Sequence, residues 1–433
     1  MESKNNTRTI GYLGAVAIGI GGMVGGGIFA VLGEAVSLAH GASVVAFLLA
    51  GIVALFTAYS YAKLSVKFQT KGGTVSFIDN AFGHNLLSGS VNFMLWLSYL
   101  VTISLYAVAF ASYAKALFIE DAGFLVNHLF ISIAIILPLM INLISASFVS
   151  RSETVIVVLK MLLLVVIIFV SISFVDIERL SPSKWEDSFS ILVAGMIIFV
   201  AYEGFELIAN AAEDIKNPTK NLPRAFYTSV IVVIVLYILI AIITVGTVSE
   251  EVLLEAKDYA LAVASEPALG SVGFTLVSVA ALMATFSAIN ASIYGNGRLG
   301  FILAVEGELP SSLQKEKNSI PTRSIITTTF FALVLANSID LTQIAIIGSA
   351  SFLLIFFIVN IAAFKLSKEI KANRFILFFA CVVSFIALIT LLVHTYVSDT
   401  QAIVIFFAFI ILSILFELGY GKYVRKHIFK RAL

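Results

Sequence analysis

Cysteine is almost absent from this 433-residue chain, and charged residues are scarce. The one cysteine, Cys381, excludes an intrachain disulfide and a cysteine-based metal cage. Charged residues make up 12% of the sequence, whereas hydrophobic residues make up 60%. Because a soluble domain of this length could not cover so much apolar surface, the composition also excludes a soluble protein.

Catalytic motifs are missing as well. The sequence contains no Walker motif, no nucleophile elbow and no zinc-binding string, so we expect no enzyme, no ATP-driven pump, no cofactor and no metal site. No basic patch with interleaved aromatic residues suggests a nucleic-acid partner. The first nine residues are polar, and the first apolar segment is too long and too rich in glycine for a cleavable signal peptide, so none is expected.

Long apolar segments dominate what is present. Many reach the roughly 20 residues that cross a bilayer, and only helices fit runs of this length. We therefore predict an all-α integral membrane protein. Twelve spans are expected near residues 10–36, 43–65, 86–118, 124–147, 154–175, 189–212, 225–247, 271–297, 324–338, 341–364, 374–396 and 400–420. The polar segment 249–269 is expected to be an external loop that can hold a short surface helix.

The basic residues are distributed unevenly between the predicted loops. Twenty-two of the 27 lysine and arginine residues fall on the side of the N-terminus, and only Arg179, Lys184 and Lys257 fall in loops on the other side. Cytoplasmic loops of membrane proteins carry such an excess of positive charge. We therefore expect a multi-pass protein of the plasma membrane with both termini in the cytoplasm.

Span 1 contains six glycines within the nine residues 19–27 (GIGGMVGGG). Each glycine weakens a helix by about 1 kcal/mol relative to alanine, so the cluster favours local unwinding. The N–H groups that start the second half-helix would suit a carboxylate, and the carbonyls that end the first would suit an ammonium group or a cation. A zwitterionic amino acid fits both ends, although glycines also allow close packing of helices. The candidate binding residues are Ile20, Gly21, Gly25, Gly26 and Gly27.

Span 6 contains a second interruption, the sequence AYEGFE at residues 201–206. Two carboxyl groups lie well inside an apolar segment there, and buried carboxyl groups tend to take up protons or find partners. Either one could carry a coupling proton, bind a substrate amine, pair with a lysine, or only hydrogen-bond the unwound backbone. The two aromatic side chains could form a lid over a substrate. The candidates are Ala201, Tyr202, Glu203, Gly204, Phe205 and Glu206.

Lys160 lies inside the otherwise apolar run 155–170 of span 5. A charged amine in hydrocarbon is costly, so such a lysine usually faces an internal cavity and has a function. The alternative is that its side chain extends to the inner membrane surface, because Arg151 is only nine residues away.

The two interrupted spans also indicate internal symmetry. Spans 1 and 6 occupy matching positions in two halves of opposite orientation, and paired interrupted helices are typical of a transporter's binding site. We predict one transmembrane transporter domain over residues 1–433. Its repeats are about 10–175 and 189–364, and two further helices cover about 374–420.

Four segments resemble the amino acid–polyamine–organocation (APC) superfamily, in the order typical of its amino acid permeases. They are the glycine motif before Ile28 and Phe29, residues 59–82, residues 201–226 with the loop that contains Asn217 and Pro218, and residues 290–310. The resemblance implies a leucine-transporter-type fold of five plus five inverted helices, with spans 1 and 6 discontinuous. It also implies alternating access to a central amino acid site.

Lys160 resembles the fifth-span lysine of a proton-coupled archaeal amino acid permease of this family. There the ammonium group takes the place of the sodium ion that lies between spans 1 and 8 in sodium-coupled relatives. By resemblance, Lys160 would reach the carbonyls near Ile20 and Gly21 and would lie near Ser287. A desolvated lysine holds its proton less tightly, which suits a proton carrier.

The chain departs from the family at Gly26, where many relatives have a serine. Charged forms of Glu203 and Glu206 would favour a cationic over a neutral amino acid. The main hypothesis is a secondary active amino acid permease coupled to protons through Lys160, with Glu203 and Glu206 as alternative proton sites. The alternatives are an exchanger without net ion coupling and a membrane amino acid sensor that does not transport. No catalytic residues are predicted.

Overall fold

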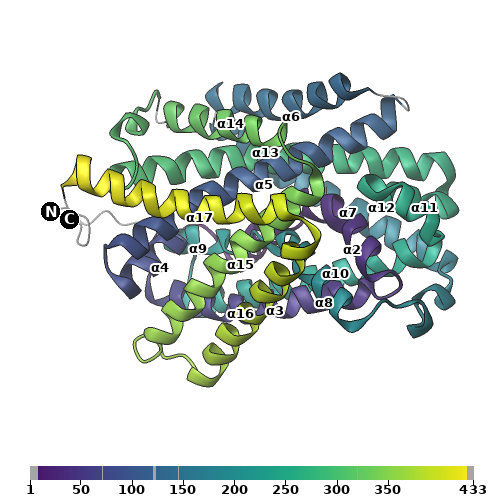
Figure 1. The fold of residues 1–433 in the computed structure, drawn as a ribbon, viewed down its shortest axis with the longest axis horizontal. Helices are drawn as coiled ribbons and strands as arrows, with labels where there is room; N and C mark the ends of the chain where they lie inside the picture. Colours follow the sequence, from purple (N-terminus) through teal and green to yellow (C-terminus); the bar gives the residue numbers. More distant parts are fainter. Residues whose placement is uncertain (1–7, 71, 120–122, 145, 319, 427–433) are drawn as a thin grey trace.

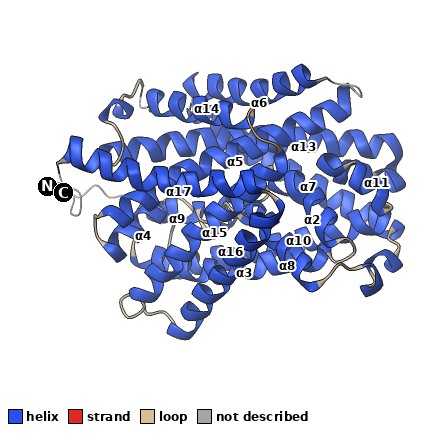
Figure 2. Cartoon of the chain, in the orientation of Figure 1, coloured by secondary structure: helices blue, strands red, loops and turns tan. Residues whose placement is uncertain are grey.

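The structure is a computed structural model that describes residues 8–70, 72–119, 123–144, 146–318 and 320–426. Helices make up most of these residues, and Figure 2 shows loops only as short connections. Among the described residues, the β-type pairing is limited to three isolated bridges. The helices are α1 (Tyr12–Met23), α2 (Gly27–Ala39), α3 (Ser43–Lys67), α4 (Gly73–Phe82), α5 (Leu86–Phe118), α6 (Phe124–Ile144), α7 (Ala146–Ser171), α8 (Ser188–Ile197), α9 (Leu207–Asn210), α10 (Pro218–Thr247), α11 (Glu250–Glu255), α12 (Ala260–Ala264), α13 (Glu266–Val305), α14 (Thr322–Ala336), α15 (Leu341–Lys365), α16 (Arg374–Ser398) and α17 (Thr400–Tyr420).

Each of the twelve predicted spans coincides with helical structure. Within the described part of the chain, ten spans are long and apolar enough to cross a membrane. The pair α1 and α2 forms a further span that is bent by 50° at its break. The ninth predicted span corresponds to α14, an apolar helix of only 15 residues. The protein is therefore a multi-pass, all-helical membrane protein.

The helix α5 lies at the centre of the bundle. In its most apolar window 94% of the residues are buried, compared with 22% for the peripheral helix α6. It packs against α13, α14, α15 and α17. Figure 1 shows α4 near one end of the bundle and α11 and α12 near the other. We call these two ends the α4 face and the α11 face.

Local sequence signals explain several helix boundaries. The side chain of Asn85 accepts hydrogen bonds from the first turn of α5, while Ser88 completes a capping box. Asn217 adopts a left-handed conformation directly before Pro218, the first residue of α10, where proline needs no hydrogen-bond acceptor. A kink at Gly270, with a φ of 59°, divides α13 where the predicted span begins.

Two segments between the spans are also helical. The predicted external loop 249–269 contains α11, the 3₁₀ turn Lys257–Tyr259 and α12. The mostly exposed α11 matches the expected short surface helix, whereas every residue of α12 is buried. The helix α4 was not predicted, because it has only 10 residues and is too short to stand out as a span.

Candidate substrate site between two broken helices

The interruptions of spans 1 and 6 cross in direct backbone contact. Span 6 runs from α8 through the 3₁₀ turn Ile198–Tyr202 into an irregular stretch before α9. A Cβ atom on Gly22 would lie 2.6 Å from the carbonyl oxygen of Gly204, and a Cβ atom on Gly204 would overlap the backbone of Gly22. Gly204 also has a φ of 117°, a conformation that favours glycine. Both glycines therefore permit an approach that side chains would prevent.

Tyr237 of α10 connects the two breaks. Its hydroxyl oxygen lies 2.7 Å from the carbonyl oxygen of Met23 and 3.0 Å from that of Ala201, so one O–H group serves both. These carbonyls end helical segments and lack intrahelical donors. Tyr237 therefore holds the two breaks in register, although the sequence alone gave no signal for this role.

A cavity of about 100 Å³ extends from this crossing towards the α4 face. It brings together residues from α1, α5, α7, α13 and the span 6 break. Its lining includes Gly21, Gly22, Gly72, Thr74, Leu95, Tyr99, Tyr106, Lys160, Glu203, Gly204, Leu207, Asn210, Ser287, Ala288, Ala291, Ser292, Gly295, Asn296 and Leu299. The predicted candidates Gly21, Lys160, Glu203, Gly204 and Ser287 thus meet at one cavity.

Lys160 projects from α7 into this cavity. Its side chain is buried, and Nζ donates a long hydrogen bond of 3.4 Å to the carbonyl oxygen of Gly21. Ser287 of α13 lines the same cavity. The side chain thus lies beside the break of span 1, in contrast to the alternative in which it reaches the inner membrane surface.

The two carboxyl groups of span 6 have different surroundings, although both are buried. Glu206 accepts a hydrogen bond of 3.0 Å from the Tyr99 hydroxyl through Oε1 and one of 2.8 Å from the Gly204 N–H through Oε2. Glu203 lines the cavity, interacts with the Glu206 carboxyl and faces the Tyr106 hydroxyl. Two carboxyl groups that interact in a buried site favour sharing a proton, because two adjacent negative charges repel each other.

The second half of span 1 is covered by a tyrosine ring. A Cβ atom on Gly26 would lie 2.5 Å from Cδ1 of Tyr106, and one on Gly25 would lie 3.5 Å from its hydroxyl oxygen. Gly27 packs against the backbone of Ala201 instead. Gly25, Gly26 and Gly27 are consequently not among the residues that line the cavity.

The other predicted residues point elsewhere. Tyr202 donates a hydrogen bond of 2.8 Å to the carbonyl oxygen of Phe47, and Phe205 packs among the rings of Tyr61, Phe226 and Phe356. The predicted aromatic lid is therefore not seen in this conformation. Ile20 lies in an apolar groove beside α7, outside the cavity.

The α11 face is closed over the breaks by the turn Lys257–Tyr259. Lys257 forms an ion pair of 2.7 Å with the buried Glu34 of α2, which also accepts a hydrogen bond from Thr342 of α15. The neighbouring Asp258 accepts a bond of 3.1 Å from Ser112 of α5. The turn therefore contacts three spans.

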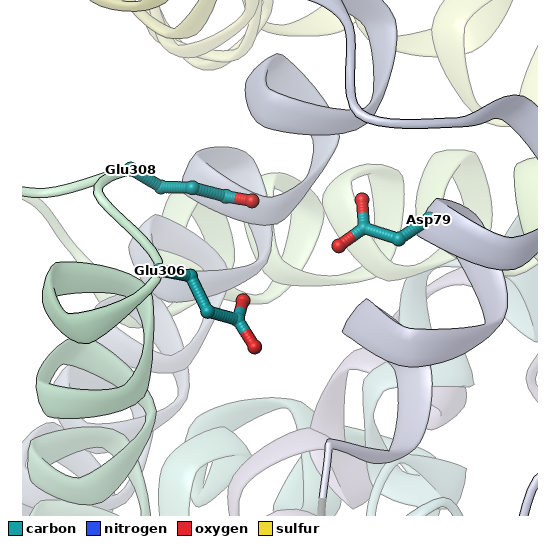
Figure 3. A group of neighbouring side chains, drawn as sticks. All are labelled: Asp79, Glu306 and Glu308. Carbon is teal, nitrogen blue, oxygen red and sulfur yellow. The ribbon is translucent and has the colours of Figure 1, made fainter. Parts of the chain in front are cut away.

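Three carboxyl groups gather near the α4 face. Figure 3 shows Asp79 of α4 opposite Glu306 and Glu308, which follow α13, and their oxygen atoms lie within 4.8 Å of one another. The Asn92 amide donates to Asp79 and Glu308 over 3.4 and 3.1 Å. These contacts join α4, α5 and the end of α13. The expectation that the protein has no metal site stays a prediction.

Comparisons with known proteins agree with this architecture. A family model described as amino acid permease matches residues 10–418. An uncharacterized protein of Methanocaldococcus jannaschii, MJ0609, is 32% identical, and the match covers 98% of both chains. The inner membrane transport protein YbaT of Escherichia coli is 31% identical, and that match covers 96% of both chains.

A solved structure shares the fold. The crystal structure of the manganese transporter of Eremococcus coleocola superimposes with a TM-score of 0.66 over 98% of both chains, at 14% identity. This likeness and the broken first and sixth spans agree with the predicted leucine-transporter-type fold. The chain is a membrane transporter rather than an enzyme, and it belongs to the amino acid permease family of the APC superfamily.

Proposed function

We propose that the protein imports amino acids by alternating access and that Lys160 carries the coupling proton. The observation that supports this most is the ammonium group of Lys160, buried in the cavity and 3.4 Å from the Gly21 carbonyl oxygen. The protonated amine satisfies a carbonyl at the break, and the neutral amine satisfies it less well. Loss of the proton would therefore loosen α7 from span 1 and favour another conformation.

The backbone at the breaks supports a zwitterionic substrate. No side chain caps the start of α2, so its first N–H groups and positive helix dipole suit a carboxylate. The carbonyls near the end of α1 suit an amine. We propose that Gly21, Glu203 and Gly204 contact the substrate at the cavity. Gly25, Gly26 and Gly27, together with Ile20, Ala201, Tyr202 and Phe205, would contribute only in another conformation.

The charge distribution supports an orientation. Basic residues such as Lys67 and Lys365 lie in the last turns of helices at the α4 face. We assign this face to the cytoplasm of a cell bounded by its plasma membrane, with both termini on that side. In this orientation the outer face is closed by the Glu34–Lys257 ion pair. The proposed repeats are residues 10–175 and 189–364, and helices 374–420 lie outside them.

Two other functions are distinguishable from this one. An exchanger would need substrate on the opposite side and would not respond to an imposed proton gradient. A sensor would bind amino acids without flux. The interacting pair Glu203 and Glu206 is a second candidate for the proton site.

The test is uptake of a mixture of the twenty radiolabelled L-amino acids into proteoliposomes, with and without an inward proton gradient and without sodium. We expect gradient-driven uptake by the native chain, its loss in Lys160→Ala, and normal uptake in the exposed control Lys184→Ala. Gradient-driven uptake that survives in Lys160→Ala would move the proton site to Glu203 or Glu206. Flux that requires amino acids inside the vesicle would instead establish exchange.

A further inference from the structure

The ring of Tyr106 occupies the space where a side chain of Gly26, the residue before α2, would lie. A Cβ atom on Gly26 would lie 2.5 Å from Cδ1 and 2.9 Å from Cγ of this ring, and 3.0 Å from Cγ2 of Thr285 on α13. No side chain could be added at position 26 without moving the ring. Gly26 and Tyr106 therefore form a matched pair in which the absence of one side chain accommodates the other.

This placement has a consequence for a ligand at the break. The N–H groups at the start of α2 are the strongest anion-binding groups of span 1, because no side chain caps them. Tyr106 lines the cavity, whereas Gly25, Gly26 and Gly27 do not. A carboxylate that enters the cavity thus meets the tyrosine ring before it meets the helix end.

The hydroxyl group of the same tyrosine faces Glu203 of the span 6 break. The hydroxyl oxygen is bonded to the ring, so the two move together, and Tyr106 is buried at 2% exposure. A movement that uncovers the start of α2 would also take the hydroxyl away from Glu203. One side chain therefore links the helix end to the carboxyl pair.

We infer that Tyr106 is a positioning residue that must leave Gly26 before a substrate carboxylate reaches the start of α2, and that its departure releases Glu203. This inference rests on the proposed amino acid site. In the conformation described here, with the Tyr106 ring against Gly26, the protein therefore has low affinity for an amino acid substrate. Any change that removes the ring from Gly26 raises the apparent affinity, because a larger fraction of the protein is then competent to bind.

The test measures binding to the purified protein at several pH values, with each of the twenty L-amino acids as a probe and thermal stabilisation as the readout. Tyr106→Leu removes the ring, and Gly26→Ala displaces it by overlap. We expect each to raise the affinity for the amino acid that binds by about tenfold, and the double variant to gain no more than either alone. Tyr106→Phe keeps the ring but loses its contact with Glu203, so its binding should depend less on pH.

Tyr113→Phe is the matched control, because Tyr113 lies one heptad further on the same helix and packs against Phe29 outside the cavity. Its affinity and pH profile should match the native protein. Weaker binding by Tyr106→Leu, or additive effects of the two changes, would overturn the inference while leaving the amino acid site intact. Binding of none of the twenty probes by the native protein would overturn the proposed function and the inference together. If Gly26→Ala does not fold, the comparison of Tyr106→Leu with Tyr113→Phe decides the question.

Discussion

Gly22 of span 1 and Gly204 of span 6 touch through their backbones, and neither position has room for a Cβ atom. The two interruptions are thereby held at a distance that only glycine allows. The contact places Lys160, Gly21 and Glu203 around one cavity.

Alanine at position 22 or 204 should destabilise the protein. Gly22→Ala would bring Cβ to 2.6 Å from the Gly204 carbonyl oxygen, and Gly204→Ala would add strain from a φ of 117°. Overpacking and backbone strain each cost about 1–3 kcal/mol, so we expect a clear fall in the thermal unfolding temperature. Gly419→Ala is the control, since nothing lies within 4 Å of its Cβ position. Equal stability of all three variants would contradict the backbone contact.

The hydroxyl of Tyr237 should stabilise the breaks of spans 1 and 6. Tyr237→Phe removes the donor that lies near the carbonyl oxygens of Met23 and Ala201, and the loss of one such bond costs about 1 kcal/mol. We expect a lower unfolding temperature and slower uptake in proteoliposomes. Tyr227→Phe, on the same helix and only partly buried, should behave like the native protein. A native-like Tyr237→Phe would argue against a role of this bridge.

The two glutamates of span 6 should respond differently to amide substitution. Glu206 accepts hydrogen bonds at both oxygens, so the NH₂ group of Glu206→Gln would either oppose the Gly204 N–H or deprive the Tyr99 hydroxyl proton of its acceptor. An unsatisfied buried group costs about 1–3 kcal/mol. Glu203→Gln mimics a protonated carboxyl that donates to Glu206, so it should retain native stability. Unfolding temperatures of the two variants at one pH check that Glu206→Gln is the less stable. A larger loss of stability in Glu203→Gln would contradict this prediction.

The ion pair between Glu34 and Lys257 should keep the α11 face closed. Lys257→Met leaves a buried carboxylate without its cation, which favours opening of the turn. The rate of thiol labelling of Ser112→Cys, in a Cys381→Ser background, measures opening of the turn. Ser112 is suitable because it is buried beneath the turn and contacts Asp258. We expect faster labelling in Lys257→Met and partial recovery when Glu34→Lys is combined with Lys257→Glu. Unchanged labelling would show that the pair does not control closure.

The sequence alone predicted the elements whose signals are local. Length and hydropathy located the spans, six glycines indicated the break of span 1, and the isolated charge of Lys160 indicated a buried function. The contact between Lys160 and Gly21 was anticipated through the family resemblance. Tyr202 and Phe205 were expected at the cavity, but their side chains pack towards α3 and an aromatic cluster, and only the three-dimensional fold decides that direction.

Contacts between distant residues could not be predicted from local sequence signals. Tyr237 contacts Met23 across 214 positions, and nothing near either residue indicates the pairing. Tyr99, Tyr106 and Tyr113 recur every seven residues and share one face of α5, but that pattern is equally typical of packing. Their separate roles depend on which residue of spans 1 and 6 each one meets.

The shortness of α14 has a consequence for the surrounding lipid. At about 1.5 Å per residue, its 15 residues span about 22 Å, whereas the hydrocarbon core of a typical bilayer is about 30 Å thick. Phe330 and Phe331 on this helix are exposed, which suits side chains that face lipid. A span this short matches a thin bilayer better than a thick one, so the length of the acyl chains would be a variable that acts on the transporter from outside.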